Sequence, residues 1–252
     1  MNKITSTPAL HPDLAEMRCD LAATFRWFAR LGMHESVANH FSLAIDAAGE
    51  SFLMNPRGMH FSRVKASDLL LLDAHDQTAL AKDNAPDPTA WFIHSAIHRR
   101  LPHARCVMHL HPKYATALAA LADSTMLPID QNTMRFFNRV AIDDGFGGMA
   151  LSSQEGDRLA KLLGSKTVLL MGNHGVLIAA STVADAFDTM YYYERACETL
   201  ITAMSSGRPL RIAPDAIAEQ TAQEWEGYGQ IGVDHLREVR TILDAAEPDY
   251  RS

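Results

Sequence analysis

The chain has 252 residues, of which 47% are hydrophobic, and its 23 Lys and Arg against 30 Asp and Glu give a formal net charge of -7. This length can bury a sizeable core, and we expect one domain over residues 1–252, with a core over about 14–204 and a helical C-terminal extension over 205–252. No apolar run reaches the roughly 18 residues of a membrane span, and the first residues show no signal-peptide pattern, so we expect a soluble, cytoplasmic protein. The acidic balance argues against nucleic acid or a membrane as a partner.

Helical and strand patterns alternate in the first half of the chain. Apolar residues recur at helical spacing before Gly32, which supplies a stop. The turn-rich residues 46–49 separate two β-type runs and predict a hairpin. The expected elements are a helix over 13–31, strands over 41–45 and 51–54, a break at 55–58, a capping serine with an apolar run over 67–72, and a helix over 89–100.

The second half continues the alternation and ends in helices. Pro112 can open a helix because the first helical position needs no N–H. Residues 172–175 form a tight turn between two β-rich runs. The expected elements are strands over 106–109, 167–171 and 176–179, helices over 113–122, 153–163 and 182–204, and one or two helices within 215–244.

Three histidines stand at the ends of expected strands. His109 and His111 are two residues apart, so they project to the same side of a strand about 7 Å apart. His174 lies in the turn between two later strands. We interpret the three as one divalent-metal site that keeps an open, catalytic coordination position, since a structural zinc is usually closed by four Cys or His. The alternative is that they are ordinary hydrogen-bonded polar residues.

The order of the motifs resembles the class II aldolase/adducin family over roughly residues 14–204. The residues that carry the resemblance are Val37-Ala38-Asn39-His40-Phe41-Ser42, Asn55-Pro56-Arg57-Gly58-Met59-His60-Phe61-Ser62, Ala66-Ser67-Asp68-Leu69, His109-Leu110-His111-Pro112 and Asn173-His174-Gly175-Val176. The resemblance implies an α/β fold of three layers, with a central, mainly antiparallel sheet flanked by helices. It also implies a homotetramer with active sites between subunits, and zinc held by the three histidines.

The sequence departs from the aldolase branch of that family at three places. Aldolases carry a catalytic glutamate in a Ser-Ser-Glu run, where this chain has Pro88-Thr89-Ala90, so the carboxylate is missing. Asn39-His40 replaces Gly-Asn, and Arg57 replaces a small hydroxyl residue of the phosphate loop. Since an arginine fork matches a carboxylate in two hydrogen bonds, we expect Asn39 and Arg57 to bind a small carboxylate substrate in place of a phosphate ester.

These departures favour decarboxylation or plain retro-aldol cleavage. A divalent metal held by neutral imidazoles can stabilise the carbanion that forms as carbon dioxide leaves, so no C–H proton has to be removed first. His40, with an ordinary pKa near 6.5, is a candidate acid for protonating that carbanion, and Asp130 is another. Gln131 follows at a position where the family usually presents pocket groups, so it is a candidate substrate contact. Zinc is the expected metal, with Mn, Co or Fe as alternatives.

Other interpretations remain open at this point. The chain could be an aldolase acting on a non-phosphorylated substrate, a non-haem Fe(II) oxygenase using the same three histidines, or a non-catalytic adducin-like module. Arg57 could form a salt bridge, and His40 could hydrogen-bond backbone in a buried turn. His94 and His98 lie four residues apart on one helix face, and we expect them to support the fold or line the pocket wall without binding the metal.

Overall fold

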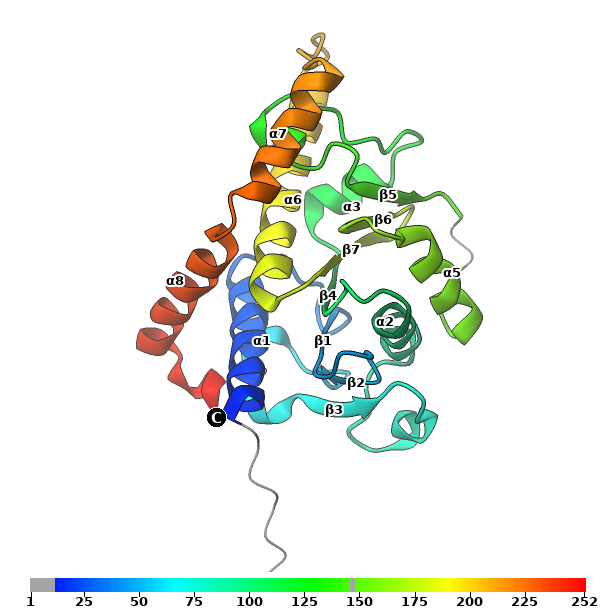
Figure 1. Ribbon diagram of the computed structural model, residues 1–252, viewed down its shortest axis with the longest axis vertical. Coiled ribbons are helices and arrows are strands. Elements are labelled where there is room, and N and C mark those ends of the chain that lie inside the picture. Colours follow the sequence, from blue (N-terminus) through cyan, green and yellow to red (C-terminus); the bar gives the residue numbers. More distant parts are fainter. Residues whose placement is uncertain (1–11, 146–147) are drawn as a thin grey trace, which may run out of the picture.

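A seven-stranded sheet lies between two layers of helices in the computed structural model, which describes residues 12–145 and 148–252 (Figure 1). The strands are β1 (His40–Ala44), β2 (Ser51–Met54), β3 (Leu70–Asp73), β4 (Cys106–Leu110), β5 (Val140–Asp143), β6 (Val168–Met171) and β7 (Gly175–Ala180). Their spatial order is β3-β2-β1-β4-β7-β6-β5, and every pair is antiparallel except β5 with β6. The expected α/β fold with a mainly antiparallel sheet is confirmed.

The helices divide between the two faces of the sheet. Figure 1 shows α1, α6 and α8 on one side and α2 and α5 on the other. The described helices are α1 (Pro12–Arg30), α2 (Pro88–Arg100), α3 (Lys113–Ala119), α4 (Gln131–Met134), α5 (Ser153–Leu163), α6 (Val183–Ser205), α7 (Asp215–Gly227) and α8 (Ile231–Ala246). Short 3-10 turns at Phe61–Arg63, Ala66–Asp68, Gln77–Ala81 and Pro248–Arg251 complete the described elements.

Strand β1 shows how the sequence assigns residues to the two faces. Phe41 and Leu43 pack in the large apolar core beneath α1 and α6. The alternating residues His40 and Ser42 therefore project to the opposite face, where they meet α2. All five residues of the strand are buried. The sheet thus carries polar side chains on the buried face beneath α2.

Most of the expected elements lie within a residue or two of the observed ones. The hairpin over 41–54 is β1 paired with β2, and the helix over 153–163 has the bounds of α5. Residues 67–72 differ, because Ser67 belongs to a 3-10 turn and the apolar run after it becomes the edge strand β3. Strand β5 and the short helix α4 were not expected from the sequence.

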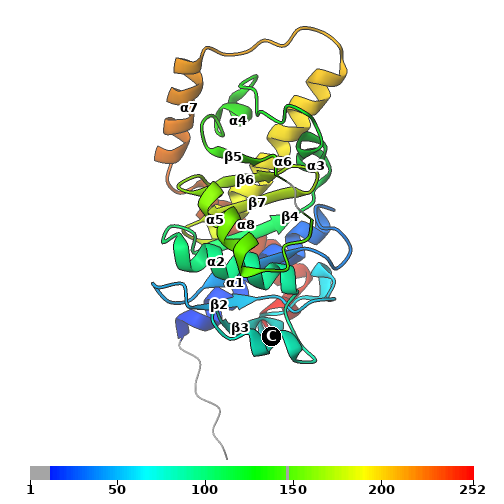
Figure 2. The same ribbon diagram turned by 90° about the vertical axis from the view of Figure 1, so that its right-hand side faces the viewer.

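The C-terminal helices continue the fold of the core. Leu236, Val239 and Leu243 of α8 belong to the same apolar cluster as α1 and α6. Figure 2 shows α7 at the end of the molecule that also holds α4, and the two helices are in contact. Within the described ranges, no helix has both the length and the hydropathy needed to cross a membrane.

Candidate metal centre

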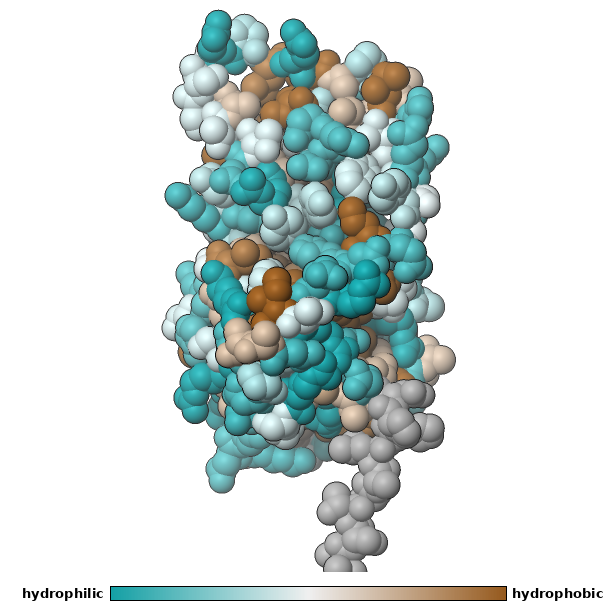
Figure 3. Space-filling model, turned by 90° about the vertical axis from the view of Figure 1, so that its left-hand side faces the viewer, coloured by the Kyte–Doolittle hydropathy of each residue, from teal (hydrophilic) through white to brown (hydrophobic). Residues whose placement is uncertain are grey.

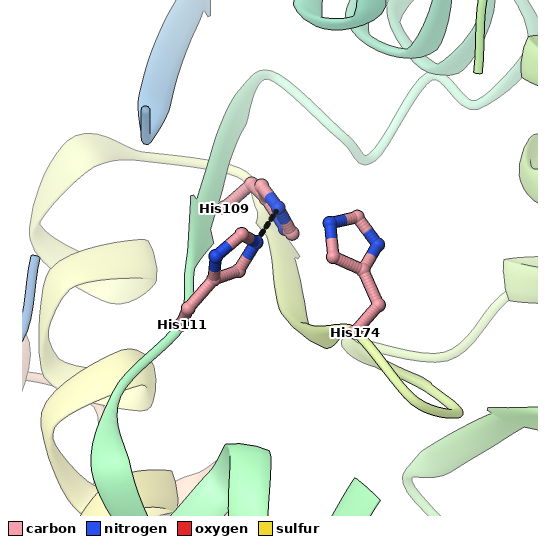
Figure 4. Close-up of side chains that lie close together, drawn as sticks. All are labelled: His109, His111 and His174. Atoms are coloured by element: carbon pink, nitrogen blue, oxygen red, sulfur yellow. Dashed lines mark hydrogen bonds between the residues drawn. The ribbon is translucent and has the colours of Figure 1, made fainter. Parts of the chain in front are cut away.

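His109, His111 and His174 come together at the end of β4 and the turn between β6 and β7 (Figure 4). One ring nitrogen from each residue lies within 4.8 Å of the others. His109 is 2% exposed, whereas the other two are partly exposed. The expected convergence of the two strand-end motifs is therefore present, with one buried and two accessible imidazoles.

Backbone geometry places His174 and His111 against each other. The β6–β7 turn contains Asn173 at φ 57°, a left-handed conformation that Asn tolerates better than most residues. The N–H of His174 donates to Met171 O at 3.1 Å and closes this turn. At Gly175 a Cβ would lie 2.5 Å from Cδ2 of His111, so the missing side chain makes room for the ligand ring.

The turn from β4 into α3 is also held in place. Pro112 is the N-cap of α3, one residue before the first helical position that the sequence suggested for it, and the helix begins at Lys113. The carboxylate of Glu194 on α6 accepts the N–H groups of Tyr114 and Ala115 at 2.9 and 2.8 Å. A negative charge at a helix N-terminus is stabilising. This contact fixes the segment that leaves His111.

Hydrogen bonds at the far side of two rings decide which nitrogens are free. Nδ1 of His109 lies 3.0 Å from Val176 O, and Nδ1 of His111 contacts the carboxylate of Glu35. Both oxygens can only accept, so each Nδ1 carries the proton and, in a neutral ring, each Nε2 carries a lone pair. These two Nε2 atoms are 2.9 Å apart. Two lone pairs at this distance repel, and a bound cation would remove that repulsion, so the donor set fits a divalent metal.

Glu35 was not anticipated from the sequence. It lies in the loop between α1 and β1, and its backbone N–H donates to Asn39 Oδ1 at 2.6 Å, which closes the loop. Its carboxylate orients His111, an arrangement common for metal-binding histidines. An isolated acidic residue in a loop carries no motif, so only the folded contact reveals the role.

Replacing Glu35 with Gln is expected to weaken metal binding by about 10- to 100-fold, because the neutral amide oxygen is a weaker acceptor for His111 Nδ1–H than the charged carboxylate and makes the ring a less basic ligand. Competition with a chelator, followed by elemental analysis, measures the change. Glu50→Gln is the matched control, since both carboxylates are 62% exposed and Glu50 lies 3.9 Å from the exposed His75. Equal metal affinity in the two variants would contradict the role of Glu35.

His40 lies beside the three histidines. It is the cross-strand partner of His109, and the two rings stack with centroids 4.9 Å apart. His40 is 4% exposed, and burial lowers its pKa to about 3, with an opposing effect of Asp87 and further lowering by His111 and His174. The lowered pKa favours a neutral ring, which can accept a hydrogen bond, and the proton-donating role expected from an ordinary pKa near 6.5 remains a prediction.

Asn39 carries a donor that has no partner. Since its Oδ1 accepts the backbone N–H of Glu35, its Nδ2 is assigned as the amide nitrogen. That nitrogen is buried and has no hydrogen-bond partner within the described part of the chain, and the residue is 2% exposed. A buried amide without a partner is costly, so a ligand oxygen is a natural acceptor for it.

The other residues proposed from the sequence, Arg57, Asp130 and Gln131, have no recorded contact with the three histidines in the described part of the chain. Arg57 is exposed on the loop after β2, and its backbone N–H donates to Ala85 O at 3.0 Å. Asp130 is the N-cap of α4, where its Oδ1 accepts the N–H of Thr133 at 2.8 Å. Gln131 lines a cavity with residues of α7 such as Trp225. The interactions recorded for Asp130 and Gln131 thus join them to α4 and α7, and none joins them to the three histidines.

The start of α2 holds one carboxylate, that of Asp87, and its Oδ1 is hydrogen-bonded to Thr89. Asp87 is the N-cap, and its Oδ1 accepts the N–H and Oγ1–H of Thr89 at 2.8 and 2.5 Å. Pro88 and Ala90 complete the first turn without an acidic group. The structure therefore agrees with the sequence that the aldolase glutamate has no equivalent at this turn.

Acid is expected to destabilise the metal-free protein between about pH 6.5 and pH 4. Burial lowers the pKa of both His98 and His174 to about 4. The unfolded chain, with ordinary histidines near 6.5, binds these protons first as the pH falls, so the free energy of unfolding decreases through this window and is restored above it. Denaturant titrations of metal-free protein at pH 7, 5.5 and 4.5 measure the change. Removing the exposed His75 with H75A should leave the slope intact, and a flat profile in the parent would refute the assignment.

Comparisons with known proteins agree with this geometry. Residues 19–201 match the model of the Class II Aldolase and Adducin N-terminal domain. The crystal structure of an aldolase II superfamily protein from Pseudomonas syringae aligns with a TM-score of 0.86 and 30% identity over 96% of this chain and 98% of that one. Decarboxylase NovR of Streptomyces niveus is 28% identical over 96% of this chain and 90% of its own length. The 4-hydroxy-3-prenylphenylpyruvate oxygenase/4-hydroxy-3-prenylbenzoate synthase of Streptomyces roseochromogenus is 28% identical over 96% and 88%. With nearly three quarters of its length matched by the family model, this chain belongs to the class II aldolase and adducin family.

Proposed function

We propose that this protein is a divalent-metal-dependent lyase that cleaves a C–C bond of a small hydroxylated carboxylate, and that the reaction is a decarboxylation. The observation that carries the proposal is the pair of Nε2 atoms of His109 and His111, which face each other at 2.9 Å with both Nδ1 atoms already used. Such a pair, joined by His174, is a site for zinc, with Mn, Co or Fe as alternatives.

The residues around the histidines define what the site can do. A bound divalent metal would polarise a carbonyl or stabilise negative charge on the substrate. Asn39 Nδ2 offers a buried donor to a substrate oxygen, and Arg57 offers an exposed guanidinium to a carboxylate. The capping Asp87 accepts hydrogen bonds from Thr89 through Oδ1, and Pro88-Thr89-Ala90 provides no carboxylate that could remove a C–H proton. Decarboxylation needs no such removal, and the relative named as a decarboxylase supports this choice.

The test is product analysis with protein of measured metal content. Hydroxybenzoates, hydroxyphenylpyruvates and aliphatic hydroxy-keto acids are supplied in turn, and carbon dioxide and aldehydes are quantified. We expect carbon dioxide from at least one acid, and none after the metal is removed with a chelator. Aldehyde without carbon dioxide would instead indicate retro-aldol cleavage of a non-phosphorylated substrate. Metal-loaded protein that releases neither product would refute the proposal.

A non-haem iron oxygenase is the second candidate, favoured by the Streptomyces roseochromogenus relative whose name includes an oxygenase activity. Imidazole ligands also suit Fe(II). The same assay without oxygen separates the two functions, because a simple decarboxylase releases carbon dioxide anaerobically. Consumption of oxygen that depends on ferrous iron would favour the oxygenase. A non-catalytic adducin-like module is the remaining alternative, and it predicts that the purified protein binds no stoichiometric metal.

Replacing Arg57 with Ala is expected to raise the KM for the carboxylate substrate about 10-fold or more, since a charged hydrogen bond contributes roughly 1.5–3 kcal/mol. The metal content should not change, because Arg57 is exposed and outside the histidine cluster. Arg63→Ala, another exposed arginine of the same connecting segment, is the control. Steady-state kinetics decide, and an unchanged KM would assign Arg57 to a surface role.

The proposal includes a cytoplasmic homotetramer whose active sites lie between subunits. Figure 3 shows hydrophobic groups distributed over the side of the molecule that carries α7 and α8. The exposed hydrophobic residues of these two helices and the turn between them are Ile217, Tyr228, Val233 and Ile242. Light scattering during size-exclusion chromatography tests the assembly, and a monomer at micromolar concentration would contradict it.

A further inference from the structure

A continuous chain of hydrogen bonds runs beneath the metal centre, between β1 and α2. Nδ1 of His40 lies 2.8 Å from Nε2 of His94, and Nδ1 of His94 lies 2.5 Å from Oγ of Ser42. Ser42 Oγ is 2.7 Å from Nε2 of His98, and Nδ1 of His98 is 2.8 Å from Ala104 O. The four side chains are 0–4% exposed. The two α2 histidines, noted in the sequence only as lying on one helix face, are therefore joined to the candidate catalytic His40.

The last acceptor sets the direction of every bond. A carbonyl oxygen only accepts, so Nδ1 of His98 carries a proton, and the neutral ring accepts from the Ser42 hydroxyl at Nε2. Because the Ser42 hydroxyl donates its one hydrogen to His98, its oxygen must accept a hydrogen bond from His94 Nδ1–H. Neutral His94 then accepts at Nε2 from His40 Nδ1–H. The tautomer of His40 follows from that of His98, three hydrogen bonds away.

Neutral rings are what this environment favours. Burial lowers the pKa of His94 well below its usual range, and it lowers the pKa of His98 to about 4. Within the described ranges, no carboxylate is hydrogen-bonded to the ring of His40, His94 or His98. An extra proton on His94 or His98 would also occupy the Nε2 that accepts a hydrogen bond, and so would break the alternation of donors and acceptors.

We propose that His94, Ser42 and His98 are positioning residues that hold His40 as its Nδ1–H tautomer, so that His40 Nε2 accepts a hydrogen bond from a hydroxyl group of the substrate. His40 is suited to this role because its ring stacks on the candidate ligand His109. The substrate part of the proposal rests on the proposed function, since it requires a hydroxylated substrate at the three histidines. The tautomer part does not rest on the proposed function, because it concerns only hydrogen bonds between side chains of this protein.

The tautomers can be read directly by NMR. The full-length, metal-free protein is labelled with ¹⁵N in its histidine rings, and long-range ¹H–¹⁵N correlations identify which nitrogen of each ring carries the proton. The signals are assigned with single variants of histidines that do not belong to this hydrogen-bonded series, together with nuclear Overhauser contacts. We expect the Nδ1–H form for His40, His94 and His98 at pH 7. An Nε2–H form at His40 would overturn the proposal, and this measurement on the parent protein needs no variant to fold.

Variants at Ser42 test whether this series of hydrogen bonds sets the tautomer of His40. Ser42→Ala removes the link between His94 and His98, and His40 should change from a single tautomer to a mixture. Ser42→Thr keeps the hydroxyl and should keep the Nδ1–H form. The control is Ser95→Ala, a buried α2 serine whose Oγ donates to Phe92 O at 3.5 Å and, among the described residues, takes no part in the bonds between His40 and His98. If the His40 tautomer is unchanged in Ser42→Ala, the hydrogen bonds through Ser42 do not set the position of the His40 proton.

A pair of probe acids tests the substrate contact. Zinc-loaded protein is titrated with 4-hydroxybenzoate and with benzoate, which differ only in the hydroxyl donor. The Nε2 resonance of His40 should shift at least several times further with 4-hydroxybenzoate. An equal response to both acids, or no response to either, would contradict the assigned contact with a hydroxyl group. A correct tautomer in a protein that releases no product would refute the proposed function alone, so the two failures are distinguishable.

Discussion

Replacing His109 with Ala is expected to remove the metal and the activity together. His109 supplies the buried nitrogen of the three, and its Nε2 lies 2.9 Å from that of His111. Loss of an outer hydrogen-bond partner weakens a metal site by about 10- to 100-fold, so loss of a ligand should exceed about 100-fold. Elemental analysis of protein purified without added metal should fall from one equivalent to near zero, and carbon dioxide release should fall with it.

Two further variants make this result interpretable. His111→Ala removes a partly exposed ligand, so it should lose the metal with less disturbance of the core than the change at His109. His75→Ala removes a histidine that is 59% exposed and should keep both metal and activity. Circular dichroism establishes that each variant is folded. A folded His109→Ala protein that retains one equivalent of metal would refute the assignment of the metal site to these three histidines.

A methyl group at Gly175 is expected to disturb the metal site and to destabilise the fold. The Cβ of Gly175→Ala would lie 2.5 Å from His111 Cδ2 and 2.7 Å from Leu110 O, closer than such atoms approach in proteins. The backbone oxygen cannot move far because Leu110 pairs with Val176 across β4 and β7. Overpacking of this kind costs about 1–3 kcal/mol, and the shifted His111 ring should lower metal affinity at least about 10-fold.

The matched control is Gly227→Ala in α7. Nothing lies within 4 Å of the Cβ it would add, and the backbone there has no positive φ. Ala is also the better helix former, so this variant should be neutral or slightly stabilising. Denaturant titration with and without metal separates the two effects. Wild-type stability and metal affinity in Gly175→Ala would show that the turn yields easily and does not position His111.

Local patterns in the sequence were sufficient for most of the framework. The two-residue spacing of His109 and His111 puts them on one face of any strand, whatever the sheet around it. Helical periodicity and turn residues identified α1, α5 and α6 within about two residues of the observed bounds, because these signals are local. Helix α4 spans about one turn, too few residues for a helical period to be recognised, and β5 is an edge strand defined by its pairing with the distant β6.

Contacts between distant segments decided the chemistry of the site. Glu35 meets His111 across 76 positions, and no spacing in the sequence indicates that contact. Asp130 and Gln131 were chosen by resemblance, yet within this chain their recorded contacts are with α4 and α7. Their expected contact with substrate therefore remains a prediction that the assembled protein must test.

The sequence by itself determined that three imidazoles stand at strand ends, and its resemblance to the family implied that the aldolase carboxylate is absent and that the fold is a helix-flanked, mainly antiparallel sheet. Only the tertiary structure decided the protonation and direction of those imidazoles. For the neighbouring imidazole of His40, burial beneath α2 lowers the pKa and favours the neutral ring, and the bonds that link it through His94 to Ser42 and His98 orient its proton. The physical reason is that desolvation and hydrogen-bond direction depend on which groups surround a ring in space, and sequence spacing does not specify that environment.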